Sequence, residues 1–144
     1  MTRRESRECA VKLTFELGFD VTRDAEEIVS NAAERDGEAP SGFARELFAA
    51  VCGNLGDIDG KIALASENWK FERIGRVPLA VLRVAAAELY FFPKIPIEIT
   101  VNEALEIAKK YDDEKAAPFV NGVLGKLTAG LVKPEAPAHA ESKE

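Results

Sequence analysis

The segment from Pro78 to Phe92, with the sequence PLAVLRVAAAELYFF, constrains the fold more than any other part of the chain. As a helix it would be apolar around almost its whole circumference, and such a helix must be buried on most of its sides. It is shorter than the roughly 20 apolar residues that cross a membrane, and it carries Arg83 and Glu88. We therefore predict that it is the central helix of an all-α bundle, starting at Pro78 and ended by the prolines that follow it.

The composition fits one globular domain in a reducing compartment. A chain of 144 residues with 47% hydrophobic residues is long enough to bury a core. No apolar stretch opens the chain, so nothing in it signals secretion, and we predict a cytoplasmic protein without membrane contact. Cys9 and Cys52 lie far apart with no CxxC pattern, which favours free thiols over the alternative of a disulfide.

Apolar residues at three- and four-residue steps predict further helices around the central one. Thr2 and Glu5 form a capping box that starts a helix ending near Leu17. No segment alternates like a strand, so the prediction is an all-α bundle of about six to seven helices. The other helices are predicted over residues 25–35, capped by Asp24; 42–65, capped by Ser41; 101–111, opened by a second capping box of Thr100 and Glu103; and 118–131, entered at Pro118.

Local patterns predict several details of this bundle. Three glycines weaken the helix over 42–65, and they indicate either close helix packing or a break. On the helix that ends at Tyr111, the apolar stripe predicts an inward tyrosine, and Glu106 and Lys110 are spaced as an outer ion pair. The connector over 66–77 is expected to plug the bundle with its apolar side chains. The residues concerned are Gly53, Gly56 and Gly60 in the helix, and Trp69, Phe71 and Ile74 in the connector.

A net charge of −6 does not indicate nucleic-acid binding, so a site of that kind must be a local basic patch. Arg3, Arg4 and Arg7 supply one, because at ~100° per residue they share an arc of about 100° at the start of the first helix. Each cation there opposes the helix dipole, by ~0.3–1 kcal/mol at low salt. The patch is either a solvated helix end or a phosphate-binding edge with helix N–H groups as added donors.

The sequence contains no constellation typical of an active site. His139 is the one histidine and falls in the predicted tail, which argues against His-dependent triads and His metal clusters. No phosphate-binding loop or zinc-ligand spacing occurs. Arg83 and Glu88 on the central helix are interpreted as a structural charge pair or as separate hydrogen bonds, with a functional acid as the alternative. We predict a binding module without catalysis, metal or cofactor.

Three stretches carry a resemblance to a known family. VLRVAAAELY, IPIEITVNEALEIAKKY and FVNGVLGKL closely resemble the C-terminal half of the NusB transcription antitermination factors, and RRESRECA is similar to their arginine-rich N-terminal motif. The resemblance covers about residues 3–128. It implies a helical bundle of two packed subdomains, with an RNA-binding domain over 1–132. From Lys133 on, Pro134, Pro137 and scattered charges independently predict a disordered tail over 133–144.

The resemblance also implies a function. Members of that family bind boxA-type single-stranded leader RNA together with NusE, a small ribosomal subunit protein. The pair joins the RNA polymerase antitermination complex and promotes read-through, notably in ribosomal RNA operons, without catalysis or a cofactor. The RNA-binding residues of the family fall on Arg3, Arg4, Arg7, Phe15, Phe119 and Asn121 of this chain.

Some positions depart from the family pattern and keep an alternative open. Glu5 stands where a third arginine is usual, and Pro118 where a basic residue is common. Pro78 and Leu79 replace charged residues that contribute to NusE binding in the family. The alternative is a protein-interaction or dimerisation bundle without specific RNA binding. Family members occur as monomers or dimers, so the resemblance also allows a homodimer, which could cover the arginines.

Overall fold

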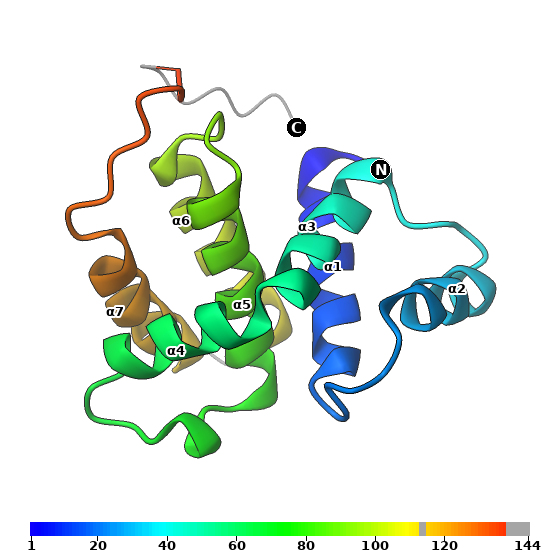
Figure 1. Ribbon diagram of the computed structural model, residues 1–144, viewed down its shortest axis with the longest axis horizontal. Helices are drawn as coiled ribbons and strands as arrows, with labels where there is room; N and C mark the ends of the chain where they lie inside the picture. The colour runs from blue at the N-terminus through cyan, green and yellow to red at the C-terminus, as the bar shows by residue number, and fades with distance from the viewer. Residues whose placement is uncertain (113–114, 138–144) are drawn as a thin grey trace.

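The chain folds into seven α-helices and one short 3-10 helix within residues 1–112 and 115–137, which the computed structural model describes (Figure 1). No strand occurs in these ranges, and the all-α prediction is confirmed. None of the helices in this part of the chain is long and apolar enough to cross a bilayer. The elements are α1 (Arg3–Leu17), α2 (Ala25–Asp36), α3 (Gly42–Gly53), α4 (Leu55–Ala65), η1 (Phe71–Arg73), α5 (Arg76–Phe91), α6 (Ile97–Tyr111) and α7 (Ala116–Thr128).

The helices gather into two groups on either side of α5. Helices α1, α2 and α3 pack on one another at one side of the molecule, and α4, α6 and α7 lie at the other (Figure 1). Helix α5 contacts both groups, since it packs against α1 and α3 as well as α4, α6 and α7. One continuous core joins the groups, with fully buried side chains such as Phe48, Leu82, Leu89 and Leu124.

The central role of 78–92 is confirmed, although α5 starts earlier than predicted. Every residue from Ala80 to Leu89 is buried, including Arg83 and Glu88. The helix begins at Arg76, so Pro78 occupies its third position rather than its first. The prediction of the boundary was wrong because the first four N–H groups of any helix lack a partner within it, so proline is tolerated at any of those positions.

Helix α1 starts as its sequence predicts. The Thr2 hydroxyl oxygen accepts a hydrogen bond from the Glu5 N–H at 3.0 Å, and the Glu5 carboxylate accepts one from the Thr2 N–H at 2.7 Å. The capping box therefore satisfies two of the N–H groups that a helix start leaves unpaired. It fixes where α1 begins, and thereby the positions of the arginines that follow.

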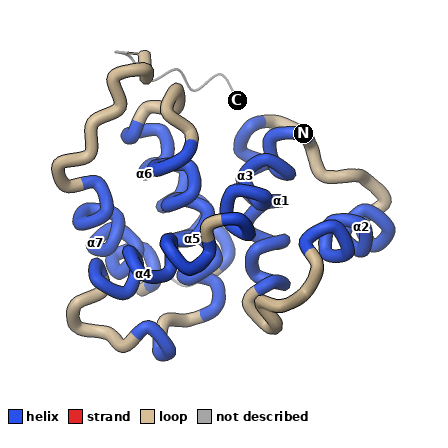
Figure 2. The backbone as a smooth tube through the Cα atoms, viewed as in Figure 1, coloured by secondary structure: helices blue, strands red, loops and turns tan. Residues whose placement is uncertain are grey.

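The single long helix predicted over 42–65 is wrong, because the chain breaks at Asn54. Its backbone leaves the helical region at φ −131° and ψ 23°, and its side-chain amide donates to the Ala50 carbonyl at 2.8 Å. Figure 2 shows a short loop between α3 and α4 at this point. The break lets α3 pack on α1 and lets α4 pack on α5 and α7. An added Cβ on the nearby glycines, 53, 56 and 60, would meet no described atom within 4 Å, so they mark no close packing.

Two other helix starts differ from prediction. Helix α6 begins at Ile97, three residues before Thr100, and α7 begins at Ala116, which puts Pro118 at its third position. The prediction of a Thr100–Glu103 capping box was wrong, because both side chains bind residues of other helices, as described below. Of the connector residues, Ile74 is buried as predicted, whereas Trp69 is 54% exposed and does not plug the bundle. Cys9 and Cys52, both in the described part of the chain, are half-buried free thiols.

The chain after α7 returns to the end of α5. The Lys133 ammonium donates to the carbonyls of Glu88, Phe92 and Ile95 at 3.1, 3.1 and 2.8 Å. Burial lowers the pKa of this ammonium group below its ordinary value. The Glu88 and Phe92 carbonyls also accept backbone N–H groups, from Phe92 and Ile95 at 3.2 Å each, so Lys133 adds a second donor there and ties the chain after α7 to the end of α5. Residues 138–144 of the predicted tail, with His139, lie outside the described residues.

Candidate nucleic-acid interface

The line where α1 meets α6 carries a row of charged and aromatic side chains. We call this row the α1–α6 seam, and it consists of Arg4, Glu8, Lys12 and Phe15 from α1 and of Glu103, Lys110 and Tyr111 from α6. Arg4 and Phe15 are eleven residues apart, so at ~100° per residue they lie within about 20° of the same helix face. At 1.5 Å per residue the seam between them is ~17 Å long.

An ion pair opens the seam at the start of α1. The Arg4 guanidinium donates to both oxygens of the Glu103 carboxylate, at 2.8 and 2.7 Å. The Arg4 side chain is 49% exposed, whereas that of Glu103 is only 7% exposed. The hydrogen bond from Arg4 lowers the pKa of the Glu103 carboxyl below its ordinary value. Arg4 therefore keeps an open side toward solvent while its donors are held by a carboxylate.

Lysines and a tyrosine occupy the middle of the seam. Lys110 donates to both Glu8 carboxylate oxygens, at 3.2 and 3.0 Å, and the Tyr111 hydroxyl donates to the same carboxylate at 3.2 Å. The pair predicted between Glu106 and Lys110 is wrong, because Glu8 takes Lys110 and the Glu106 carboxylate meets Lys109 at 3.6 Å. Tyr111 was predicted to point inward but is 37% exposed.

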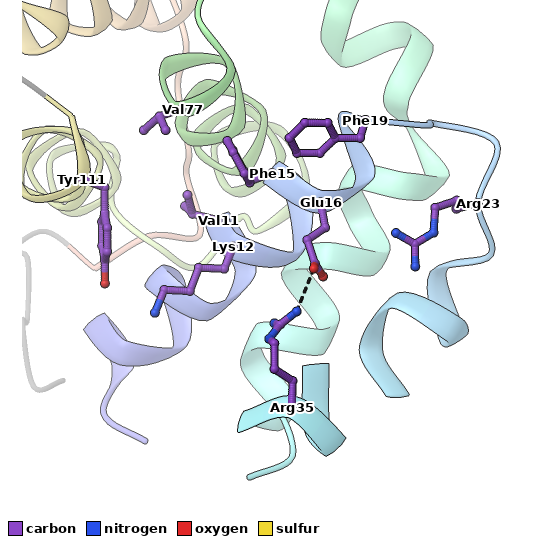
Figure 3. Close-up of a pocket in the computed structure, with 9 residues that line it drawn as sticks. All are labelled: Val11, Lys12, Phe15, Glu16, Phe19, Arg23, Arg35, Val77 and Tyr111. Atoms are coloured by element: carbon purple, nitrogen blue, oxygen red, sulfur yellow. Dashed lines mark hydrogen bonds and ion pairs between the residues drawn. The ribbon is translucent and has the colours of Figure 1, made fainter. Parts of the chain in front are cut away.

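The far end of the seam opens into a groove with aromatic walls (Figure 3). Its volume is about 540 Å³, and we call it the aromatic groove. The Phe15 and Phe19 rings meet edge to face with centroids 5.2 Å apart, and Phe19 is 60% exposed. On the α2 side an ion pair of 2.8 Å joins Arg35 to Glu16 (Figure 3). The lining residues are Val11, Lys12, Phe15, Glu16, Phe19, Arg23, Arg35, Val77 and Tyr111.

Cations lie against the aromatic rings of this groove. The Arg76 guanidinium is 4.2 Å from the centroid of the Phe19 ring, and Lys12 Nζ is 5.4 Å from the centroid of the Tyr111 ring. Exposed aromatic rings can stack on unpaired bases of any sequence, and arginine or lysine beside them can neutralise phosphates. The seam and the groove together thus have the parts of a track for a single-stranded nucleic acid.

Arg3 and Arg7 lie apart from the seam although they belong to the same helix. Arg3 is exposed and its guanidinium sits 3.8 Å above the ring centroid of Phe43 in α3. Arg7 is only 3% exposed and is bound by Glu88 of α5. The predicted arc of three arginines therefore divides into two exposed side chains and one buried side chain.

Glu88 and Arg83 do not pair with each other. Glu88 binds Arg7 and accepts a hydrogen bond from the Thr100 hydroxyl at 2.7 Å. Arg83 instead donates to both oxygens of the Asp59 carboxylate in α4, each at 2.8 Å. A direct Arg83–Glu88 pair is therefore wrong, and each group uses a partner from a different helix. Within the described residues, no group of three or more His, Cys, Asp or Glu side chains is arranged to hold a metal ion.

Comparison with known proteins decides the family. A family model described as the NusB family matches residues 4–129. The chain belongs to the NusB family. A transcription antitermination protein NusB from Natranaerobius thermophilus is 36% identical over 137 residues, covering 92% of this chain and 99% of the relative. Another, from Geobacter sp. (strain M21), is 38% identical over 144 residues, covering 93% and 99%.

Solved NusB structures share the fold. The NusB of T. maritima superimposes with a TM-score of 0.80 at 34% identity, covering 94% of this chain and 95% of that one. A crystal structure of the antitermination factors NusB and NusE in complex with dsRNA contains a chain with a TM-score of 0.78 at 24% identity, covering 89% and 96%. At this identity the second likeness concerns the fold alone. The predicted NusB-like bundle is confirmed.

The two remaining residues that the NusB resemblance singles out lie on α7. Phe119 is half-buried, and its ring packs edge-on against Trp69 with centroids 6.0 Å apart. Asn121 is exposed and lines a separate hollow with Leu105, Lys109 and neighbouring residues. Neither is among the described residues that line the aromatic groove. Of the six expected residues, the structure thus brings only Arg4 and Phe15 together on the seam.

Sequence reasoning missed several side chains that line this candidate site. Lys12, Lys110 and Tyr111 line the seam, and Phe19 and Arg76 line or flank the groove. Phe19 gave one usable signal, since a phenylalanine directly after the helix-ending Gly18 has no place in the α1 stripe. Lys12, Lys110 and Tyr111 come together because α1 and α6 lie side by side, and Arg76 reaches Phe19 from the start of α5; no local pattern reveals either arrangement.

Proposed function

We propose that the protein is a transcription antitermination factor that binds boxA-type leader RNA together with NusE and promotes read-through by RNA polymerase, notably in ribosomal RNA operons. The relatives that cover almost the whole chain carry the name transcription antitermination protein NusB, which denotes a transcription factor rather than an enzyme. A protein of the same fold has been solved with NusE and dsRNA. The protein would act in the cytoplasm, where RNA polymerase transcribes.

One observation carries the RNA-binding part of the proposal. The seam and the groove combine exposed cations with exposed aromatic rings, although the whole chain has a net charge of −6. In this proposal Lys12, Lys110 and Arg4 neutralise phosphates, and Phe15 and Tyr111 stack on bases of a splayed single strand. Arg3, Phe119 and Asn121 stay candidates for RNA contacts at either end of the track.

The test is fluorescence anisotropy with a labelled boxA-like RNA and a scrambled RNA, at several salt concentrations, with and without the cognate NusE. We expect preferential binding to boxA-like RNA that NusE enhances. Lys12→Gln should make the plot of log K against log salt less steep by about 0.7, which is the contribution of one phosphate of a single strand. Lys61→Gln is the matched control, because this exposed lysine of α4 pairs with Asp57 away from the groove.

The alternative is a protein-interaction or dimerisation bundle without specific RNA binding. It predicts that NusE is captured from a nuclease-treated lysate while neither RNA shifts, with or without NusE. Sedimentation analysis of the free protein at the assay concentration then separates a monomer from a homodimer. Equal affinity for boxA-like and scrambled RNA in all conditions would refute the proposed function.

A further inference from the structure

Arg7 sits at the meeting point of four helices. Its guanidinium donates to the Glu88 carboxylate of α5 through Nε, at 3.0 and 3.2 Å to the two oxygens, and through Nη2 at 2.9 Å. Its Nη1 is 4.0 Å from a Glu103 oxygen of α6, and its guanidinium is 5.4 Å from the ring centroid of Phe43 in α3. A single side chain of α1 therefore reaches α3, α5 and α6.

Burial removes Arg7 from any nucleic acid. The Arg7 side chain is 4% exposed and that of Glu88 is 1% exposed. The Thr100 hydroxyl donates to the same carboxylate at 2.7 Å, so Glu88 is bound from α1 and α6 at once. A phosphate would have to open this network and strip Arg7 from Glu88 before it could bind. The charge of Arg7 is already neutralised in the folded protein.

The position of Arg7 on α1 gives the network a second role. Arg7 lies one turn after Arg3 and Arg4 and about two turns before Phe15. A planar guanidinium that binds a carboxylate through two nitrogens fixes direction as well as distance. The rotation of α1 on α5 is thereby set at Arg7, and with it the direction in which both the arginines and Phe15 face.

We propose that Arg7 is a positioning residue: held by Glu88 and Thr100, it sets the rotation of α1 so that Arg4 and Phe15 face RNA on one track, and it contacts no phosphate itself. This inference rests on the proposed RNA binding. It assigns the arginine-rich start of the chain two separate tasks. Arg3 and Arg4 supply charge at the surface, and Arg7 supplies geometry from the interior.

The test compares three variants by RNA affinity and by its dependence on salt, at a temperature where circular dichroism shows each to be folded. Arg7→Lys keeps the positive charge but loses the planar guanidinium that binds the Glu88 carboxylate through two nitrogens. Positioning predicts an affinity lower by about fivefold or more, the lower end of what one stacked base contributes, with the wild-type salt slope. A phosphate contact predicts near wild-type affinity and slope, because lysine also binds phosphate, and that result would overturn the proposal.

The double variant Arg7→Met with Glu88→Leu covers the case in which Arg7→Lys does not fold. Exchange of a whole buried ion pair for apolar side chains of similar volume is often tolerated, and the Thr100 hydroxyl can then turn to a carbonyl of its own helix. We expect this protein to keep the wild-type slope. A slope less steep by about 0.7, the value for one lost phosphate contact, would overturn the proposal.

Arg3→Gln is the control that removes an exposed cation from the same helix. If Arg3 contacts RNA, the slope of log K against log salt becomes less steep in Arg3→Gln, whereas the positioning role predicts an unchanged slope in the double variant. The outcomes also separate the two proposals of function and position. A wild-type protein that binds no RNA refutes both, whereas wild-type binding combined with a loss of slope in the double variant refutes only the positioning role.

Discussion

The Arg4–Glu103 pair predicts a variant that binds RNA more tightly than the wild type. Glu103 holds the Arg4 guanidinium with two hydrogen bonds, at 2.8 and 2.7 Å, and therefore competes with any phosphate for the same donors. Glu103→Gln removes the negative charge and keeps the size of the side chain. The remaining amide oxygen can accept one hydrogen bond from Arg4, which leaves the rest of the half-exposed guanidinium for RNA.

The size of the gain follows from counterion release. One additional phosphate contact with a single strand makes the slope of log K against log salt steeper by about 0.7. At 0.1 M salt this corresponds to roughly a fivefold gain in affinity, or about 1 kcal/mol. The folded state loses about 1 kcal/mol in return, because a pair whose arginine is 49% exposed is worth little more than a surface ion pair.

The assay is the same salt series of anisotropy titrations, with thermal denaturation of the free protein alongside. Glu106→Gln is the matched control, because this exposed acid also lies on α6 but pairs with Lys109. Both variants raise the net charge by one, so only a specific release of Arg4 separates them. An affinity of Glu103→Gln equal to that of Glu106→Gln, with an unchanged slope, would refute the competition between Glu103 and phosphate for the Arg4 guanidinium.

Three further predictions concern stability. Because the pKa of the Glu103 carboxyl is lowered in the folded protein, this group stabilises the fold at pH values above its unfolded pKa of ~4.3, and that stability is lost as the pH falls through the folded pKa. In an acid titration followed by circular dichroism, Glu103→Gln should therefore lose less stability than the wild type. Gly60→Ala, inside α4 with open space around it, should stabilise by about 0.5–1 kcal/mol in urea unfolding, whereas Gly37→Ala, at φ +72°, should destabilise by about 1–2 kcal/mol; effects of the same sign would contradict the backbone argument. Phe48→Ala should cost about 3–5 kcal/mol in the same assay, because its side chain is 1% exposed in the core, and a loss below about 1 kcal/mol would contradict that burial.

Features that depend on neighbouring residues were predictable from sequence. The Thr2–Glu5 capping box uses two side chains three residues apart, and it forms as predicted. The buried character of α5 also follows from its own composition, since no choice of partner would give it a solvated face. Apolar periodicity supplied the approximate number of helices, and the NusB resemblance supplied their grouping into two packed subdomains.

Features that depend on distant partners were not predictable. Thr100 and Glu103 match the capping-box pattern, but Glu88 and Arg4 offer their side chains charged partners, and the helix starts earlier. The burial of Arg7 likewise depends on Glu88, 81 residues away. Local patterns record which contacts a side chain can make, and they do not record which distant group competes for it.

Asn54 shows a third kind of limit. The apolar stripe continues from α3 into α4, so periodicity alone predicts one helix. The break lets α3 and α4 share α5 as a neighbour while α3 also packs on α1 and α4 also packs on α7. Its local signals were a run of glycines and an asparagine, which weaken a helix without fixing where it ends.

The two buried charges of α5 give this helix something that its apolar surface lacks. A helix that is apolar on all sides can rotate or shift along its axis with little change in the apolar surface area that it buries. Arg83 and Glu88 are five residues apart and therefore point about 140° away from each other, one to Asp59 of α4 and the other to Arg7 of α1. Together the two ion pairs restrain the rotation of α5 from two different directions. The orientation of α5, whose Val77 lines the aromatic groove, is thus restrained by two ion pairs that form no part of the groove's lining.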